Sequence, residues 1–547
     1  MKKIYLFVLA SIICSTLSAQ NLNPEVEVTN EYEARMSGLL KNGFDMTVPD
    51  SLRQFSTDID YSVFATTYKG AYDFTPYQIN VTPEAGGSNA TRLYLRAGAG
   101  YSFHPVLKAA FAPAMDGNLK NADYLDFHGY GGKYGRADAG ADYDGHDYNL
   151  GVGGNLRLHK EKFDIFGELG YNGIYTADDI VKSGFHDISL GGRIASNDPG
   201  LKMPYGFKTE LAYAADRFST PGWDPLGEFS YLIDGTVSPE LAEVFDLAID
   251  VHTQGSFYSR RFAPMLLSWL APKAVFEWDA LRLAAGVKVC IGGGFGLYPD
   301  VMANYRIAGG LVDVYAGVSG GRNAFDYSSI KTANHWVNPD YFPSDETASI
   351  DAMKVSVERI NARIGFRGSV AGRFQYDVCG GWASYANAVM DALGVSQDIS
   401  IAGKMYVPGI EYADYNAAYV KMDADWVSDN LDVSSDVLFR KSNITANDTY
   451  LGIPALQGTL SAIYNWNRRV FAGVRAKGQT GRPSTVWDDK GFLDLGLYGE
   501  YALMPELSVW LQAGNLLNSD IALSPTHIPG GDGLKMHFTG GICLRLR

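Results

Sequence analysis

Hydrophobic and polar residues alternate in short segments along most of the chain from Arg92 to its last residue. Alternation with a period of two residues predicts β-strands that have one apolar and one polar face. The final segment, Met536–Arg547, shows this pattern most fully. Its apolar face carries Phe538, Ile542, Leu544 and Leu546, and its polar face carries Thr539, Gly541, Cys543, Arg545 and Arg547. Such a strand fits the closing stave of a membrane barrel, between lipid and lumen, or the edge of a soluble β-sandwich.

The alternating segments occur in pairs, each joined by a short polar turn and followed by a longer polar stretch. Ten such hairpins are predicted. They are Leu93–Phe103 with Val106–Ala112, Tyr148–Leu158 with Phe163–Tyr171, Ile188–Ala195 with Gly206–Ala214, Phe229–Val237 with Phe245–Thr253, Ala274–Trp278 with Leu281–Ile291, Val301–Ile307 with Leu311–Val318, Ile360–Phe366 with Val370–Trp382, Tyr415–Val427 with Leu431–Phe439, Thr459–Trp466 with Val470–Lys477, and Phe492–Tyr501 with Leu507–Gly514.

The strand count favours the membrane barrel over the sandwich. Ten hairpins, the terminal strand and one strand before Arg92, such as Gln78–Val81, give about 22 strands, or roughly 20 to 24 once boundary errors are included. A soluble sandwich seldom exceeds about ten strands. The predicted fold class is therefore all-β: a transmembrane antiparallel β-barrel of about 22 strands, preceded by a short irregular N-terminal segment.

The lengths of the connections predict an orientation. In outer-membrane barrels the short turns and both chain ends face the periplasm, and the long loops face outward. Five polar stretches are predicted as outer loops: Ala114–Asp147, Ala215–Gly227, Gly321–Val355, Ala386–Asp414 and Asn515–Lys535. The third contains Trp336, Tyr341 and Phe342. These aromatic residues are interpreted either as binding residues at a loop tip or as residues that pack the loop onto its neighbours.

The amino-acid composition agrees with this fold and argues against one class of binding partner. The chain has 547 residues, with 34 Tyr, 27 Phe and 61 Gly, as expected for aromatic girdles and many tight turns. It has no apolar run of about 18 residues or more, so any membrane span is predicted to consist of strands. The net charge of −15 argues against nucleic acid as a partner. Membrane lipid is the expected surrounding.

The N-terminal residues predict export. Lys2 and Lys3 precede the apolar stretch Ile4–Ile13, and Ala19 offers a small residue for cleavage. Residues 1–19 are therefore predicted to be a bacterial signal peptide. Residues 20–75 are predicted to form a periplasmic or lumen segment, and residues 76–547 the transmembrane barrel. The predicted location is the bacterial outer membrane.

Little in the sequence indicates catalytic or metal-binding chemistry. Cys290, Cys379 and Cys543 remain after cleavage and are too few and too widely spaced for a disulfide scaffold, and each is predicted to be a small buried residue that faces the lumen. Asp142–Asp147 has the spaced carboxylates and glycine of a calcium loop but lacks its downstream glutamate. His128 and His146 have no metal-ligand spacing. No catalytic, cofactor-binding or metal-ligating residue is predicted, and no enzyme activity is expected.

The C-terminal residues resemble those of TonB-dependent receptors. The matching features are the strand at Val509–Leu511, the motif Asn515-Leu516-Leu517-Asn518, the loop dipeptide Pro529-Gly530 and the final strand Phe538–Leu546. The Ser18-Ala19-Gln20 signal ending is similar to that of Bacteroidetes proteins of this type. The resemblance implies a 22-stranded outer-membrane barrel that the barrel assembly machinery recognises through its last strand, and energised uptake of a bulky ligand.

The sequence departs from that family at its N-terminal side. Such receptors carry a plug domain of well over a hundred residues, whereas residues 20–91 are about half that length and show no plug signature. Two functions are therefore expected as alternatives. One is solute uptake or passage across the outer membrane. The other is a plugless structural scaffold that holds periplasmic or surface protein partners in an outer-membrane complex.

Overall fold

The structure of the chain is a computed structural model. The described residues are 93–101, 105–112, 119–135, 142–160, 162–177, 182–198, 200–218, 225–242, 245–307, 311–343, 353–396, 405–445, 452–483, 491–519, 521 and 536–546. The predicted signal peptide, the segment 20–75 and the candidate strand Gln78–Val81 lie outside these residues. Within them, no helix has the length and apolar character needed to cross a membrane.

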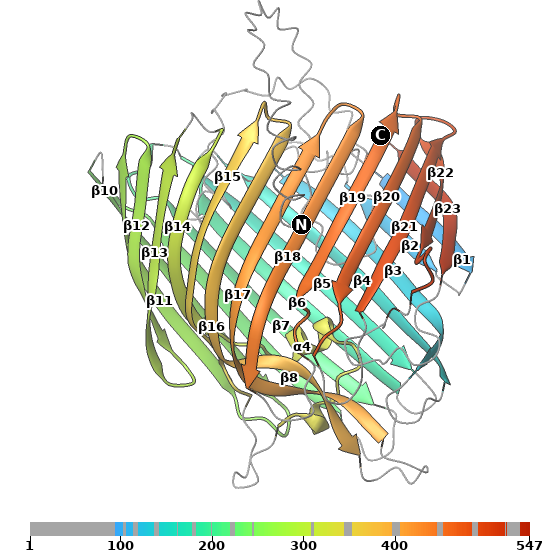
Figure 1. Cartoon of the computed structure of the whole chain (residues 1–547), viewed down its shortest axis with the longest axis horizontal. Coiled ribbons are helices and arrows are strands. Elements are labelled where there is room, and N and C mark those ends of the chain that lie inside the picture. Colours follow the sequence, from blue (N-terminus) through green and yellow to red (C-terminus); the bar gives the residue numbers. More distant parts are fainter. Residues whose placement is uncertain are drawn as a thin grey trace, which may run out of the picture. The chain divides into compact units, whose positions relative to one another are not determined.

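One antiparallel sheet contains all the described strands (Figure 1). They are β1 (Leu93–Tyr101), β2 (Val106–Phe111), β3 (Leu119–Gly135), β4 (Asp142–His159), β5 (Phe163–Ala177), β6 (Lys182–Ser196), β7 (Tyr205–Phe218), β8 (Leu226–Val237), β9 (Glu240–Ala242), β10 (Phe245–Tyr258), β11 (Met265–Trp278), β12 (Leu281–Ile291), β13 (Phe295–Arg306), β14 (Asp313–Asn323), β15 (Ser356–Val370), β16 (Phe374–Ser396), β17 (Met405–Val427), β18 (Leu431–Thr445), β19 (Leu456–Trp466), β20 (Val470–Thr480), β21 (Gly491–Ala502), β22 (Leu507–Gly514) and β23 (His537–Leu546).

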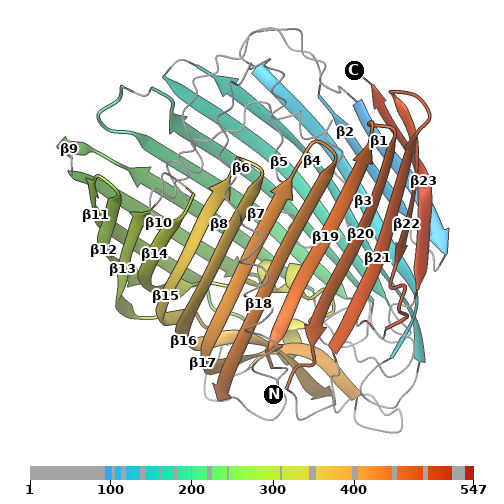
Figure 2. The ribbon, with the colours of Figure 1, turned by 45° about the horizontal axis from the view of Figure 1, so that its top comes forward.

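The sheet closes on itself. Each strand pairs with the next along the chain, except that β8 pairs with β10, and β1 pairs with β23 from Leu93↔Leu546 to Tyr101↔Phe538. The short β9 pairs with β10 beyond the end of β8, so that the ring counts as a 22-strand antiparallel sheet. Figure 2 shows the tilted strands surrounding a common interior. The predicted barrel of about 22 strands is confirmed, and so are the ten hairpins, although several strands are longer than predicted.

Two details of the predicted strand order were wrong. The count of about 22 included one strand before Arg92. In the structure the place of that strand in the count is taken by β3, which lies within the stretch Ala114–Asp147 that was predicted as a loop. Because β1 pairs with β2 on one side and directly with β23 on the other, no strand from before Arg92 lies between β23 and β1. Counting antiparallel strands from β1, the connection between β1 and β2 then lies at the opposite end of the ring from the β4–β5 turn.

The two ends of the ring differ in their connections. We call the end that carries the β4–β5, β11–β12, β15–β16, β17–β18, β19–β20 and β21–β22 turns the short-turn end. The opposite end carries the connections 324–355, 397–404 and 515–536, and we call it the loop end. The stretch predicted as the loop Ala386–Asp414 is largely strand, because β16 and β17 continue past a bulge at Asn387 to the pair Ser396↔Met405.

The outer face of the ring is apolar between two sets of aromatic residues. Exposed aromatic residues at the short-turn ends of strands are Trp278, Tyr305, Trp426, Tyr464, Trp466 and Tyr501. Those near the loop end are Tyr101, Phe229, Phe257 and Phe295. On β13, Phe295 and Tyr305 are ten residues apart. At about 3.3 Å per residue and a tilt of roughly 45°, they span about 23 Å, close to the apolar band of an outer-membrane barrel.

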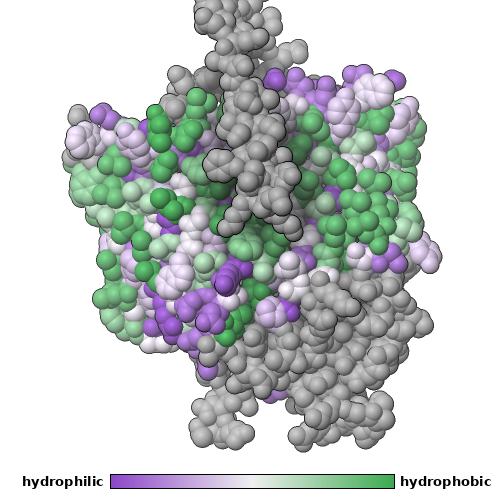
Figure 3. All heavy atoms as spheres, in the orientation of Figure 1, coloured by the Kyte–Doolittle hydropathy of each residue, from purple (hydrophilic) through white to green (hydrophobic). Residues whose placement is uncertain are grey.

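Apolar residues predominate at mid-height of the strands in Figure 3, and hydrophilic residues gather toward the rims. The alternation predicted for the last strand is confirmed, since Phe538, Ile542 and Leu546 are exposed whereas Thr539 and Cys543 are buried. Cys290 and Cys543 are buried on the inner face, as predicted, whereas Cys379 lines an inner pocket and is only partly buried. The apolar band and the closed sheet thus place the described strands in a lipid bilayer.

Candidate functional site: an insertion that closes the loop end

The β14–β15 connection folds inward as two short helices. Its described residues include α4 (Tyr327–Ala333) and the 3-10 helix η2 (Pro339–Tyr341). Asp326 caps α4 by accepting a hydrogen bond from the backbone N–H of Ser329 at 3.0 Å. Asn338 caps η2 in the same manner, from the N–H of Asp340 at 2.9 Å. These local caps satisfy backbone donors that would otherwise be unpaired at the helix starts.

The apolar side of this insertion packs against the inner face of the ring. Tyr327, Ile330, Val337 and Phe342 are buried in one cluster with side chains from β5, β6, β7, β8, β11 and β17. Those wall residues are Ile174, Phe185, Ala214, Leu226, Met265, Leu267 and Ile410. Side chains from seven segments therefore form a hydrophobic core at the loop end of the lumen, where a pore would otherwise be open.

A buried ion pair lies at the centre of the contact. Lys331 Nζ lies 2.9 Å from Asp216 Oδ2 of β7, and the two side chains are 1% and 0% exposed. Ser183 Oγ of β6 donates to the other carboxylate oxygen at 2.7 Å, and Lys331 also donates to Ser183 Oγ and the carbonyl of Val337, each at 3.1 Å. The desolvated charges are thus fully hydrogen-bonded, as a buried pair requires.

Tyr327 completes this group. Its hydroxyl donates to Asp216 Oδ2, so that a phenol and an ammonium share one carboxylate. Burial of the ring, and secondarily the charge of Asp216, raise the pKa of Tyr327 well above its usual value. The phenol therefore stays protonated and keeps donating to Asp216.

Further polar contacts tie the insertion to the same wall. The N–H and Oγ of Ser328 donate to the carboxylate of Glu228 on β8, at 3.1 and 3.0 Å. Gln254 of β10 donates to the carbonyl of Ala324 at 3.0 Å. His335 lies 2.8 Å from Asp147 of β4. Contacts to β4, β6, β7, β8 and β10 hold one side of the insertion.

Other contacts reach β16 and β17, on the opposite side of the insertion. Asn334 donates to Asp391 of β16 at 3.0 Å, and the N–H of Asn338 donates to the carbonyl of Pro408 on β17 at 2.9 Å. Val389 and Tyr412, from the parts of these strands beyond the bulge, pack against the core cluster. Figures 1 and 2 show these strand ends beside α4. The insertion is therefore held from two sides and spans the mouth.

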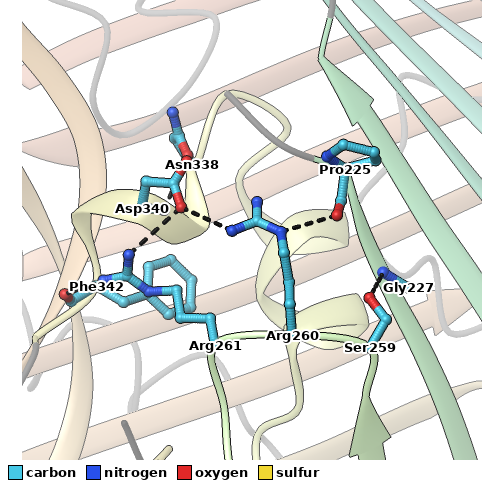
Figure 4. Close-up of polar contacts among 8 residues, drawn as sticks. All are labelled: Pro225, Gly227, Ser259, Arg260, Arg261, Asn338, Asp340 and Phe342. Carbon is cyan, nitrogen blue, oxygen red and sulfur yellow. Dashed lines mark hydrogen bonds and ion pairs between the residues drawn. The ribbon is translucent and has the colours of Figure 1, made fainter. Parts of the chain in front are cut away.

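The β10–β11 connection provides a third anchor, shown in Figure 4. The guanidinium groups of Arg260 and Arg261 both point toward the carboxylate of Asp340, at 3.2 and 3.4 Å. Arg261 also donates to the carbonyl of Phe342 at 3.2 Å, and Arg260 to the carbonyl of Pro225 at 2.8 Å. These contacts fix η2 next to the rim.

The residues singled out from the sequence have mixed outcomes. Trp336 is 2% and Phe342 5% exposed, so these two pack the loop, as one of the two interpretations predicted. Asp142–Asp147 belongs to strand β4 rather than to a loop, and Asp147 pairs with His335. No cluster of three potential metal ligands occurs among the described residues.

Sequence reasoning missed the residues that hold the closure. Asp216 and Lys331 are far apart along the chain and both lie in stretches predicted as loops, so their pairing has no local signature. The one local signal was Asp326 followed three residues later by Ser329, which is typical of a helix start. That signal predicts a helix but not where the helix docks.

A closed 22-strand sheet, an apolar outer band and an inward-folded insertion define a bacterial outer-membrane β-barrel, in the location that the sequence predicted. No protein-family model matches the sequence, and comparison with curated proteins found no relative. The fold, however, is similar to that of solved TonB-dependent receptors.

Three of these structures illustrate the similarity. The siderophore receptor PirA from Acinetobacter baumannii has a TM-score of 0.61 at 8% identity, covering 84% of this chain and 80% of the receptor. The copper transporter OprC has a TM-score of 0.57 at 13% identity, covering 83% and 80%. The FrpB iron transporter from Neisseria meningitidis has a TM-score of 0.57 at 12% identity, covering 83% and 81%. At such low identity the similarity establishes the fold.

Proposed function

We propose that the chain is a transport barrel of the outer membrane, in which a solute passes through the lumen and the inserted residues 324–343 close the outer mouth until they are displaced. By the usual distribution of turn lengths, the loop end faces outward and the short-turn end faces the periplasm. The insertion is then the first barrier that an external solute meets. The docking of this insertion onto two sides of the mouth is the observation that carries the proposal.

The similarity to receptors and transporters of siderophores, copper and iron supports a transport class of function. The size of the barrel supports it as well. Side chains alone fill the interior of a barrel of about eight strands, whereas larger barrels enclose a channel or hold a separate plugging segment. Here the described part of the chain supplies such a segment from one of its own loops.

Conductance measurements on loop-replacement variants test this function. The register pairs Asn323 with Ser356, so a two-residue Asn-Gly turn can replace residues 324–355 without separating β14 from β15. In planar bilayers we expect the full chain to stay mostly closed and the replacement variant to conduct steadily. A matched control replaces residues 397–404 with the same turn between the paired residues Ser396 and Met405, and should behave as the full chain does.

The residues before the barrel require a second comparison. Each protein is therefore measured with and without residues 20–91, while the predicted signal peptide is retained. If the replacement variant conducts in neither form, the transport proposal is wrong. Recovery of a stoichiometric protein partner in mild detergent, together with absent conductance, would instead support the structural scaffold.

A further inference from the structure

The inner wall over β14–β18 contains a pocket of about 280 Å³. Its lining combines four phenol rings with an amide and a guanidinium group: Tyr315, Tyr385, Tyr415, Tyr419, Asn361 and Arg363. The described residues of the insertion make polar contacts only with the far ends of β16 and β17 among these five strands, away from the pocket. Its volume is near the lower limit of small-molecule sites, about 300 Å³, which suits a single ring.

The phenol rings are held in fixed positions. Tyr385 and Tyr415 stack with their centroids 4.7 Å apart. Tyr385 donates to Glu358 at 3.0 Å, and Tyr419 donates to Asn361 Oδ1 at 2.8 Å. Rings fixed by stacking and hydrogen bonds lose little conformational entropy when they bind a ligand.

Tyr419 lies flat along the wall. In the register, Gly381 of β16 pairs with Tyr419 of β17, and a Cβ atom at Gly381 would lie 2.6 Å from the Tyr419 ring. The ring therefore covers the space that a side chain would fill at Gly381. A ring that lies along the wall presents its face toward the lumen, where the apolar C–H face of a sugar can pack against it.

Arg363 lies on the other side of Gly381 in the same cross-strand row. The carboxylates of the pocket already have partners: Asp377 accepts from Tyr315 at 2.5 Å, and Asp423 pairs with Lys421 at 2.6 Å. Arg440 donates to Gln457 at 2.8 Å. Among the described residues, the Arg363 guanidinium has no hydrogen bond or ion pair. Its five donors are therefore available for an oxyanion, which a guanidinium binds in a bidentate manner.

We propose that this pocket binds an anionic carbohydrate. Arg363 holds the carboxylate or sulfate group, Tyr419 packs against the sugar ring, and the remaining phenol and amide groups contact its hydroxyls. This inference rests on the proposed passage of solute through the lumen, and it names the class of solute. The chemistry common to the candidates is an oxyanion on a hydroxylated ring.

Calorimetric titration of the purified full chain in detergent tests the site. The probes are glucuronic acid, glucose 6-sulfate and glucose, which separate carboxylate, sulfate and neutral sugars. We expect saturable binding of at least one anionic sugar, at least about 10-fold tighter than that of glucose, because hydrogen bonds to a charged group are stronger than neutral ones. Equal binding of the neutral sugar, or no saturation at about 10 mM of either anion, would overturn the proposal.

Two variants examine the roles of the residues. Arg363→Gln should weaken binding of the anionic sugar by roughly 10-fold or more and leave glucose binding unchanged. Tyr419→Leu should weaken binding of all three sugars, because it removes the aromatic face that packs against the sugar ring. Arg475→Gln, on the β20 part of the inner wall outside the pocket, is the matched control and should bind as the full chain does.

These outcomes are independent of conductance. If the barrel conducts but binds no anionic sugar, the proposed transport function stands and the proposed binding site is wrong. If Arg363→Gln fails to fold, as judged by its heat-dependent gel mobility, Tyr419→Leu still decides the role of the pocket. Unchanged binding in Tyr419→Leu would then contradict the proposal.

Discussion

Lys331 and Asp216 form the most deeply buried ion pair at the mouth, and the hydrogen bonds around them show why it is tolerated. Both oxygens of Asp216 and the ammonium of Lys331 have partners within the site. Removing one partner of such a pair leaves an uncompensated buried charge, which costs about 3 to 5 kcal/mol. The same pair exposed at a surface contributes only about 0 to 1 kcal/mol.

Lys331→Met should therefore open the mouth. The buried carboxylate of Asp216 loses its cation, so we expect openings in planar bilayers to become at least about 100-fold more frequent. Lys208→Met is a matched control, because Lys208 pairs with Glu210 at 3.3 Å while both side chains remain well exposed. Similar opening frequencies in the two variants would show that the buried pair does not hold the closure.

At the scale of elements, the insertion is a structure that only its surroundings stabilise. The helix α4 has seven residues, and isolated helices shorter than about 12 residues are marginal in water. The fold of the whole insertion is stabilised by packing against the wall and by the hydrogen bond between Asn338 and Pro408 of β17. An element of this kind can detach as a unit, because few of its stabilising contacts are internal.

A reversible disulfide tests whether the insertion moves. The backbone hydrogen bond between Asn338 and Pro408, at 2.9 Å, brings their backbones close enough for a disulfide to span. In the double variant Asn338→Cys and Pro408→Cys, oxidation should abolish the openings and reductant should restore them. Each single variant serves as a control and should show no response to oxidant. Openings that persist in the oxidised double variant would place the conducting path elsewhere.

At the scale of the whole molecule, the barrel depends on the seam between its first and last strands. Arg96 of β1 lies over the rings of Trp510 and Tyr498, with its guanidinium carbon 4.0 and 5.5 Å from their centroids. Glu500 of β21 accepts from Arg545 of β23 at 2.5 Å. A Cβ atom at Gly98 would lie 2.4 Å from the Trp510 ring, so glycine at this position lets the indole cross to β1.

Trp510→Ala should destabilise this seam. Truncation of a buried tryptophan costs about 3 to 5 kcal/mol, and the cation–π contact with Arg96 is lost as well. We expect the temperature of heat-induced unfolding, followed by gel mobility, to fall clearly. Trp466→Ala is the control, because Trp466 is 63% exposed on the outer face whereas Trp510 is 4% exposed. An equal fall in both variants would contradict a special role for the seam.

Features that depend on residues close together in the sequence could be predicted, whereas features that depend on contacts between distant residues could not. The two faces of β23 follow from alternation with period two, which is a local pattern, and they were predicted correctly. Strand β3 was missed, because Gly129, Gly131 and Gly132 and its many polar residues interrupt the apolar alternation. The end of the barrel predicted for the β1–β2 turn was wrong for the same reason. One missed strand reverses the direction that is assigned to the strands before it.

The sequence by itself determined the class of fold, the approximate number of strands and the face of the last strand that meets lipid, because all three follow from residues adjacent along the chain. Only the tertiary structure decided that residues 324–343 fold back into the lumen and that Asp216 receives Lys331. It also decided that Arg363, Gly381 and Tyr419 share one row of the wall. Those arrangements depend on closure of the ring, which brings together residues that no local pattern relates.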